Sequence, residues 1–264
     1  MAFHPLWIHK FETAPDKWVF VPSDEARKTG SKILERLAGR WTPPTIYCHM
    51  HPGGHVKASA QHTKHDFFAC LDLKGFFNSI NRSRVTRVLK PFFGYSDARE
   101  MAKDSVLTIF RNGAKTSILP FGFVQSPMLA SLCLDKSALG SALLYHSRIE
   151  GLTISVYVDD IIVSSPTENL VLDAVSRIRA ASERSGFAIH EEKSQGPAAI
   201  VQAFNLEISN SSLRVTAKRM EQFRTDYLSS ASDAVRRGIE SYVRSINEDQ
   251  AGELENLLSS DGNP

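Results

Sequence analysis

Tyr157-Val158-Asp159-Asp160 is the stretch that decides the fold of this chain. Its two adjacent acids lie between two apolar runs typical of β-strands, residues 152–156 and 161–163. The connection between the runs is too short to be a loop, so the pattern predicts a β-hairpin with both carboxylates at its tip. Acids are poor strand residues and two neighbouring acids repel each other, so this arrangement costs stability. A bound divalent cation would offset that cost.

A third acid follows an earlier apolar segment. Residues 67–71 are predicted to form a strand that ends at Asp72. Carboxylate oxygens are the ligands that magnesium prefers, and a pair of such ions is the apparatus of nucleotidyl transfer. We therefore interpret Asp72, Asp159 and Asp160 as a candidate site for two magnesium ions. The structural alternative is a strand-end turn residue at Asp72 and an exposed turn at Asp159 and Asp160.

Length and composition are those of a folded protein of moderate size. The chain has 264 residues, of which 42% are hydrophobic, and this is enough to bury a real core. The formal net charge is +2, so any nucleic-acid binding must come from local basic clusters. No apolar run of about eighteen residues occurs and the first residues do not read as a signal peptide, so neither a membrane span nor secretion is expected. Three widely spaced cysteines indicate reduced thiols in a cytoplasmic protein.

Apolar periodicity and capping residues predict the other elements in outline. Strands are expected at residues 16–22, 116–119, from 187 onward, 203–208 and 213–215. Helices are expected at residues 24–37, 82–89, 96–110, 127–149, 167–185, 218–228 and 233–246. Asn112-Gly113 is a typical hairpin turn.

Residues 45–66 concentrate histidine in one short region. The zinc-type side chains there are Cys48, His49, His51, His55, His62 and His65. Zinc prefers such ligands, so a zinc site is one interpretation, but the spacing matches no compact zinc motif. We favour a polar strand and turn beside a phosphate path, to which Lys57 and Lys64 would contribute positive charge.

Five segments, in order, resemble the catalytic motifs of reverse transcriptases. They are residues 68–80, 119–127, 157–160, 186–193 and 204–208, which read FACLDLKGFFNSI, LPFGFVQSP, YVDD, GFAIHEEK and FNLEI. A lone YVDD is a weak signal, whereas five ordered motifs at sensible spacing are specific. The resemblance covers roughly residues 60–250 and is to prokaryotic retron-type and related defence-associated enzymes, whose thumb resembles residues 239–247. Retron enzymes usually carry Val-Thr-Gly where this chain has Val201-Gln202-Ala203, which favours the broader defence-associated group.

The resemblance implies an α+β fold of the right-hand polymerase type. Such a fold has fingers, a palm in which an antiparallel sheet packs on helices, and a small helical thumb. The fingers would comprise residues 1–66 with 82–115 interleaved, and the palm residues 67–81 and 116–208. The thumb and an acidic C-terminal end would comprise residues 209–264.

The resemblance also implies an RNA-directed DNA polymerase that adds dNTPs with two magnesium ions, which manganese can replace. Asp72 and Asp159 would bridge the ions, Asp160 would assist, and the backbone carbonyl of Leu73 is a further candidate ligand. The expected nucleic acids are an RNA template and an RNA/DNA hybrid. A structured non-coding RNA or a second protein is the expected partner, in prokaryotic antiphage defence.

Two phenylalanines are expected at the nucleotide. Phe77 lies five residues after Asp72, where the family places a ring that excludes the ribose 2′-hydroxyl. The alternative is a core aromatic, because Phe76 and Phe77 alternate faces and one of them must be buried. Phe121 occupies the place of the usual glutamine, and this departure removes a hydrogen-bonding group from the nucleotide pocket.

The second and fourth motifs add further candidates. Gly122 would let the chain approach the nucleotide closely, and Gln125 and Ser126 would line the template or nucleotide path. Lys193 matches the family's lysine near the triphosphate, a candidate general acid for the leaving pyrophosphate. The alternative for Lys193 is an ordinary solvated lysine. Further triphosphate candidates in the fingers are Lys57 and Lys64.

Basic residues gather in the predicted thumb. Residues 214–244 hold seven Lys or Arg against four acids, whereas residues 245–264 hold five acids and no Lys or Arg. The candidates to follow a duplex backbone are Lys218, Arg219, Arg236, Arg237 and Arg244. Scattered surface charge accounts for several of them equally well.

Two other functions stay open from the sequence. One is a polymerase-like protein that binds RNA or a partner and has lost templated synthesis. The other is an enzyme that makes untemplated or protein-primed DNA. The acids of the hairpin and Phe77 favour the templated polymerase, whereas Phe121 and the histidine-rich segment keep the alternatives open.

Overall fold

A four-stranded antiparallel sheet forms the centre of the molecule in the computed structural model, which describes residues 6–14, 17–111, 113–230 and 232–260. Its strands, in spatial order, are β6 (Thr153–Tyr157), β7 (Asp160–Ser165), β3 (Phe67–Asp72) and β8 (Gln195–Ala198). The predicted hairpin is confirmed, because β6 and β7 pair down to Tyr157 and Asp160. In the neighbouring pair, Phe67 lies opposite Ser165 and Asp72 lies opposite Asp160.

Alternate residues of β3 and β7 contribute to two different cores. Ala69 and Leu71 of β3 join the main hydrophobic cluster, whereas Phe68 and Cys70 join a second cluster on the other face. Successive strand side chains point to opposite faces, so an uninterrupted apolar run supplies both layers. This is why the sheet can be covered on both sides.

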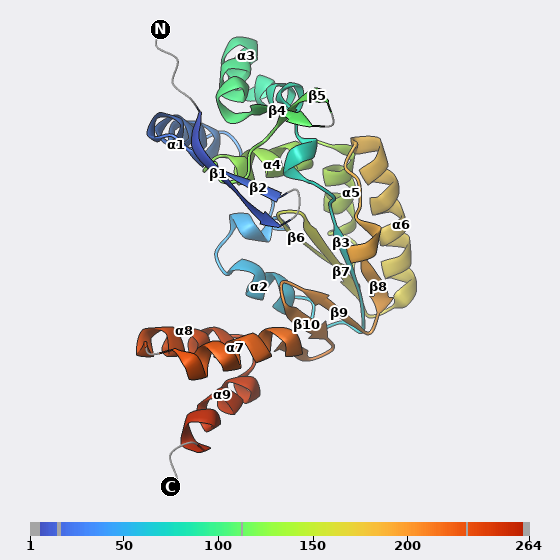
Figure 1. The fold of residues 1–264 in the computed structure, drawn as a ribbon. Helices are drawn as coiled ribbons and strands as arrows, with labels where there is room; N and C mark the ends of the chain where they lie inside the picture. Colours follow the sequence, from blue (N-terminus) through green and yellow to red (C-terminus); the bar gives the residue numbers. More distant parts are fainter. Residues whose placement is uncertain (1–5, 15–16, 112, 231, 261–264) are drawn as a thin grey trace.

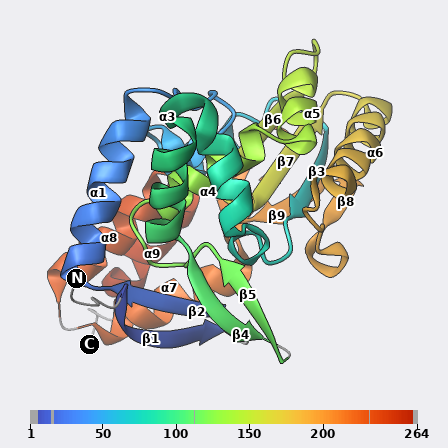
Figure 2. The same ribbon diagram turned by 90° about the horizontal axis from the view of Figure 1, so that it is seen from above.

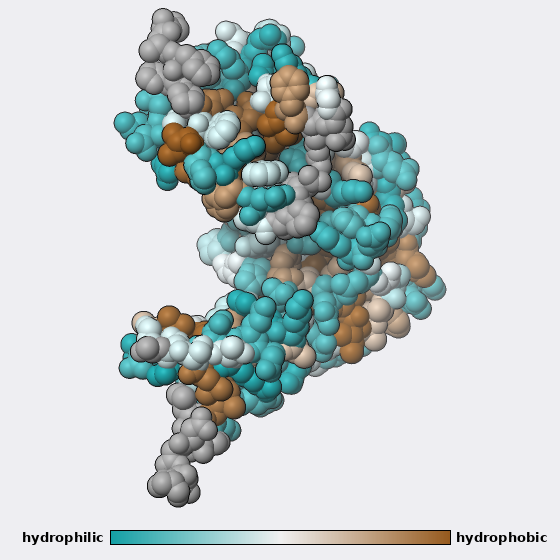
Figure 3. All heavy atoms as spheres, viewed as in Figure 1, coloured by the Kyte–Doolittle hydropathy of each residue, from teal (hydrophilic) through white to brown (hydrophobic). Residues whose placement is uncertain are grey.

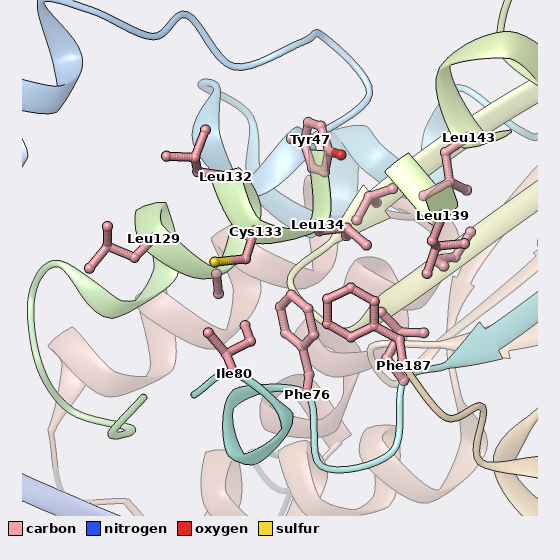
Figure 4. Packing of buried hydrophobic residues seen from close by; sticks show 14 of the residues in the cluster. Tyr47, Phe76, Ile80, Leu129, Leu132, Cys133, Leu134, Leu139, Leu143 and Phe187 are labelled. Carbon is pink, nitrogen blue, oxygen red and sulfur yellow. The ribbon is translucent and has the colours of Figure 1, made fainter. Parts of the chain in front are cut away.

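Helices cover the main-core face of the sheet. They are α4 (Ser126–Asp135), α5 (Ala138–His146) and α6 (Glu168–Ser185). Helix α6 buries Val171, Val175 and Ile178 at helical spacing and ends at Gly186, whose φ of 64° is easily reached only by glycine. Figure 4 shows Phe76 and Phe187 facing the side chains of α4 in this core.

The second core joins the sheet to the C-terminal helices. A three-stranded sheet of β9 (Ile200–Ala203), β10 (Leu206–Ser209) and β11 (Ser212–Val215) precedes α7 (Ala217–Ser229), α8 (Asp233–Arg244) and α9 (Glu248–Ser260). Phe223, Val243 and Leu254 of these helices bury their side chains with Phe68 of β3. Figures 1 and 3 show the helices projecting from one end of the sheet, below an open hollow.

The opposite wall of that hollow is formed by the N-terminal part of the chain and the segment after β3. Its elements are β1 (Trp7–Ala14), β2 (Lys17–Pro22), α1 (Asp24–Ala38), α3 (Arg82–Ser105), β4 (Leu107–Arg111) and β5 (Ala114–Ile118). Figure 2, seen from above, shows α1 and α3 side by side, beside the two hairpins. Ser23 caps α1 by accepting a hydrogen bond from Ala26 N.

Several predicted elements are wrong in extent or type. The strand expected in residues 45–66 is a 3-10 turn, η1 (Cys48–Met50), followed by α2 (Gly54–Ala60). The helix expected at 96–110 ends at Ser105, and the β-branched residues after it form β4. The helix expected at 127–149 is divided, because Ser137 caps a new helix by accepting a hydrogen bond from Gly140 N.

Other differences concern elements that local patterns did not show. The strand expected from residue 187 is only an isolated bridge between Leu73 and Ile189, followed by η3 (Glu191–Lys193). Strands β1 and β9 and helix α9 were not predicted. The predicted turn at residues 112–113 contains Asn112, which lies outside the described residues, but Arg111 and Ala114 pair on either side of it.

The histidine-rich segment is an internal hydrogen-bond network. His62 is fully buried and joins Ser164 at 2.7 Å and Ser155 at 2.8 Å, so it ties the helical segment to β6 and β7. His65 joins Ser164 at 2.8 Å. Both imidazoles thus join the hydroxyl of Ser164. The described residues include no group of three or more His, Cys, Asp or Glu side chains arranged to hold a metal ion. All three cysteines are free thiols.

We expect His62 to make the fold sensitive to acid. Burial lowers the pKa of His62 from 6.5 to about 3. Below pH 6.5 the unfolded chain therefore binds a proton that the folded chain refuses, and the free energy of unfolding should fall by about 1.4 kcal/mol per pH unit from this residue. Urea unfolding of the wild type and His62→Asn at several pH values measures the effect. The variant should be less stable at neutral pH but should show a shallower decline in acid, and parallel declines would contradict the assignment.

Among the described helices, none is both long enough and apolar enough to cross a membrane.

Candidate active site

The three acids meet at one end of the central sheet. Asp72 ends β3 and lies opposite Asp160, the first residue of β7. The neighbouring backbone holds the third acid in place, because Leu73 N donates a hydrogen bond to Asp159 O at 2.9 Å. The antiparallel register therefore brings together residues that are almost ninety positions apart in the chain, as the sequence predicted. We call Asp72, Asp159 and Asp160 the carboxylate site.

The carboxylate site is electrostatically unfavourable without a cation. Burial, and then the charges of Asp159 and Asp72, raise the pKa of Asp160 to about 7. Burial also raises the pKa of Asp159, with a further contribution from Asp72. Asp159 and Asp160 thus resist ionisation, and a divalent cation bound beside them would relieve this.

The donor set suits magnesium in kind. It offers hard carboxylate oxygens from three residues at one sheet end, and such ligands select magnesium or manganese over zinc. Among the described residues, no three His, Cys, Asp or Glu side chains are close enough together to hold a metal ion in the structure as it stands. A bound ion would therefore draw the three carboxylates closer together while removing their mutual repulsion.

His49 supports the turn that carries Asp159. Val158 has a φ of 61°, which is strained for a β-branched residue. Its backbone N–H donates to His49 Nδ1 at 3.0 Å, so the ring proton is on Nε2, which donates to Ser131 Oγ at 2.7 Å. Ser131 in turn donates to the carbonyl of Pro127 at 2.8 Å. This chain of bonds fixes the turn to α4, and burial lowers the pKa of His49, which keeps the ring neutral.

Sequence reasoning interpreted His49 as a zinc or phosphate candidate and missed its positioning role. The strained turn between β6 and β7 needs an external partner, but only the tertiary structure identifies which residue supplies it.

Phe77 and Phe121 are in contact beside the carboxylate site. Their ring centroids are 5.2 Å apart, nearly at right angles. Phe76 is buried in the main core, whereas Phe77 is only partly buried. The two phenylalanines therefore divide as expected, with Phe76 serving the core and Phe77 free to face a ligand.

Lys17 is a site residue that the sequence did not reveal. Its Nζ lies 5.2 Å from the Phe121 ring centroid, and its charge lowers the pKa values of Asp159 and Asp160 against the stronger effects that raise them. The β1–β2 hairpin brings this cation over the end of the sheet (Figure 1). Nothing in its local sequence distinguishes it from other strand lysines.

Gly122 has a structural reason to be glycine. A Cβ there would lie 2.4 Å from Phe20 O, and its φ is 106°. Phe20 N donates to Phe121 O at 2.8 Å, so the close approach is to β2. The structure thus gives a packing explanation where the sequence suggested an approach to the nucleotide.

The structure does not support the prediction that Gln125 and Ser126 line the template or nucleotide path. Gln125 is fully buried and Ser126 is 1% exposed, so neither can line a nucleotide or template path in this structure. Gln125 Nε2 donates to Ser105 Oγ at 3.4 Å, and Gln125 Oε1 lies against Gly30. Their apparent place in the motif reflects the packing of α4 beneath the site.

The three lysines predicted to contact the triphosphate differ in their distance from the carboxylate site. Lys193 Nζ lies 3.8 Å from Asp72 Oδ2, so it belongs to the site. Lys64 precedes β3 at the end opposite Asp72, and the six residues of that strand span about 17 Å, which excludes Lys64 from the site. Lys57 is exposed on α2. His55 of the same helix packs on the ring of Tyr157, so Lys57 lies in a region compatible with its predicted contact to a triphosphate.

The C-terminal helices are tied directly to the hairpin. His55 Nε2 and Tyr242 Oη of α8 are 2.9 Å apart, and the rings of Tyr157 and Phe204 contact the same imidazole. The helices therefore have a defined position relative to the carboxylate site.

Several basic residues of these helices already have partners within the protein and are therefore less available to contact phosphates. Arg236 donates to Tyr227 O at 3.1 Å and Ser230 O at 2.5 Å, which joins α7 to α8. Arg244 pairs with Glu248 at 3.1 Å and with Glu255 of α9. Arg219 lies over the Phe223 ring at 4.2 Å. Lys218 and Arg237 are exposed and have no described ion pair, so they are the better phosphate candidates among the five.

We therefore expect Arg237→Ala to weaken binding to an RNA/DNA hybrid about equally for different sequences. One lost phosphate contact should flatten the log–log salt dependence by about 0.9. A salt titration of binding measures the slope. Arg236→Ala is the matched control, since its loss should lower thermal stability and leave the slope largely unchanged. Equal slopes for Arg237→Ala and the wild type would show that Arg237 is only a solvated surface charge.

Comparisons with known proteins agree with this geometry. The chain matches the reverse transcriptase (RNA-dependent DNA polymerase) family over residues 13–228. It is similar to a foamy viral protease–reverse transcriptase in complex with double-stranded DNA, at 18% identity and a TM-score of 0.50, covering 95% of this chain and 38% of that chain. The same viral protein in complex with an RNA/DNA hybrid is similar at 16% identity and a TM-score of 0.50, covering 88% of this chain and 26% of that chain.

A telomerase gives a further likeness. The enzyme from Candida albicans, in complex with a TWJ fragment of telomeric RNA, is 11% identical with a TM-score of 0.55, covering 90% of this chain and 45% of that chain. The chain spans less than half the length of these three structures. No curated protein matches the sequence. The structures share the α+β right-hand polymerase fold with this chain, and because the family match extends over most of the sequence, the chain belongs to the reverse transcriptase family.

Proposed function

We propose that the protein is an RNA-directed DNA polymerase that adds dNTPs with two magnesium ions, or manganese in their place. The observation that carries this proposal is the pairing of Asp72 with Asp160 beside Asp159, in a site where the charged forms of Asp159 and Asp160 are disfavoured. A structural role would not require three acids at such a cost. Nucleotidyl transfer requires carboxylates that hold divalent cations against phosphate oxygens.

The chain's own residues then have distinct parts. Asp72 and Asp159 would hold the ions with help from Asp160 and the Leu73 carbonyl, and the ions would neutralise charge on the attacking and leaving oxygens. Lys193, which lies beside Asp72, would give a proton to the leaving pyrophosphate. Lys17 would attract the triphosphate. Phe77 would exclude a ribose 2′-hydroxyl.

The finer assignment concerns organisation and partners. Residues 1–66 and 82–115 would act as fingers, 67–81 and 116–208 as palm, and 209–264 as thumb, around an RNA template or an RNA/DNA hybrid. The motif resemblance supports a retron-type or defence-associated enzyme of the cytoplasm with a dedicated structured RNA or second protein. Phe121, whose ring contacts Phe77, keeps open the alternative of a polymerase-like binding protein or an untemplated enzyme, because it stands where the family usually has a glutamine.

Extension of a DNA primer on an RNA template tests the proposal. The purified chain should incorporate the dNTP that the template specifies, only with magnesium or manganese present. Incorporation that ignores the template would establish the untemplated alternative. Binding of the hybrid without incorporation, under conditions where a known reverse transcriptase is active, would establish the binding protein.

A further inference from the structure

Helix α3 forms a basic pocket at its break. Gly94 has a φ of 78° and a ψ of 172°, which divides the helix into two segments that meet at an angle. A cavity of about 300 Å³ lies against them, lined by Arg82, Ser83, Thr86, Arg87, Lys90, Tyr95 and Arg99. We call this cavity the α3 pocket. Its lining includes four cations and no acid, and none of its residues belongs to the carboxylate site.

Among the described residues, no acid forms an ion pair with the exposed cations of the α3 pocket. Arg87 and Lys90 are exposed, and no ion pair is described for either of them. Asp97, on the second segment of α3, is paired with Arg36 of α1 at 2.6 Å. Arg82 Nε is buried and has no hydrogen-bond partner among the described residues. A buried donor without a partner is costly, and an anion in the pocket would accept a hydrogen bond from Arg82 while the exposed cations attract it.

The pocket also offers an aromatic surface. Tyr95 is 56% exposed, and its hydroxyl accepts a hydrogen bond from Arg99 Nη1 at 3.0 Å, which holds the ring beside the cations. A single nucleic-acid strand presents phosphates and unstacked bases together, and proteins bind it by combining cations with aromatic rings. A duplex hides its bases, and a free phosphate would not use the ring.

We propose that the α3 pocket is a second nucleic-acid site, which binds one unpaired strand. A phosphate is held by Arg82, Arg87 and Lys90, and the adjacent base stacks on Tyr95. The arrangement reads no base edge, so recognition is tolerant of sequence. The site goes beyond the proposed polymerase function, because it would hold a flanking or structured RNA strand outside the carboxylate site.

Binding of a short fluorescent oligouridylate RNA to the full chain, with the polymerase cleft filled by an RNA/DNA hybrid, tests the proposal. Arg87→Ala/Lys90→Ala should weaken binding about tenfold and flatten the salt slope by about 1.4, from two lost single-strand contacts. Tyr95→Ala should weaken binding at least about fivefold, whereas Tyr95→Phe should retain it. Lys103→Ala/Arg148→Ala removes two exposed charges elsewhere and should bind as the wild type does.

Three results would overturn the proposal. One is an unchanged affinity and salt slope for Arg87→Ala/Lys90→Ala in a folded protein. Another is equal competition by a short polyglutamate, which would show that the pocket recognises negative charge as an acidic protein would supply it. The third is loss of primer extension in the same variant, which would place the pocket within the polymerase path. Conversely, Asp159→Asn should bind oligouridylate normally, so failure of the polymerase assignment and failure of this site are separate results.

Discussion

Asp159→Asn and Asp160→Asn should each reduce nucleotide incorporation by at least about a thousandfold, because ligands that neutralise transition-state charge contribute several kcal/mol. The same substitutions should stabilise the protein without magnesium. The folded-state pKa of each acid is raised, to about 7 for Asp160, so ionisation at higher pH works against folding. At pH 8 the Asp160 carboxylate of the wild type is charged beside two other acids, and an amide there removes its share of the repulsion. We expect a gain of about 1 kcal/mol, modest because water screens a partly exposed site.

Two measurements separate these effects. Primer extension reports the loss of catalysis, and urea unfolding at pH 5 and pH 8 reports the stability. The gain for Asp160→Asn should be larger at pH 8 than at pH 5, where the wild-type carboxyl is already protonated. Magnesium should stabilise the wild type more than either variant. Wild-type incorporation by a folded variant, or a magnesium effect that does not depend on these acids, would contradict the metal assignment.

Phe77→Val should relax discrimination against ribonucleotides by about tenfold to a hundredfold, the usual range for a change in a steric pocket. The reason is that the partly buried Phe77 ring projects from the turn after Asp72, whereas the neighbouring Phe76 fills the core. The quantity to measure is the ratio of kcat/KM for GTP and dGTP on the same primer and template. The ratio should rise mainly through faster use of GTP.

Two variants serve as controls for the gate. Phe121→Gln restores the residue usual in the family and removes the ring that contacts Phe77, so it should change the ratio less than Phe77→Val does. Phe76→Leu should lower the free energy of unfolding through lost core packing and leave the ratio unaltered. An unaltered ratio in folded Phe77→Val would leave Phe77 with a packing role only.

Local patterns were sufficient for the features that depend on neighbours in the chain. The 157–160 hairpin, the Ser23 cap of α1 and the Gly186 end of α6 all follow from alternation, capping or glycine chemistry within a few residues. Local patterns failed where non-local packing competes with propensity. Residues 107–110 were expected to continue a helix, but pairing with β5 makes them a strand.

The motif resemblance implied the polymerase fold, and the sequence by itself located the three acids at the ends of predicted strands, because motifs and apolar periodicity are properties of contiguous residues. Only the tertiary structure decided the surroundings of those acids. It brought Lys17 and His49 to the site, buried Gln125 and Ser126, and placed Lys64 at the wrong end of β3. The physical reason is that a side chain's exposure and partners depend on segments that are remote in sequence but pack against it. A local sequence pattern does not contain these contacts.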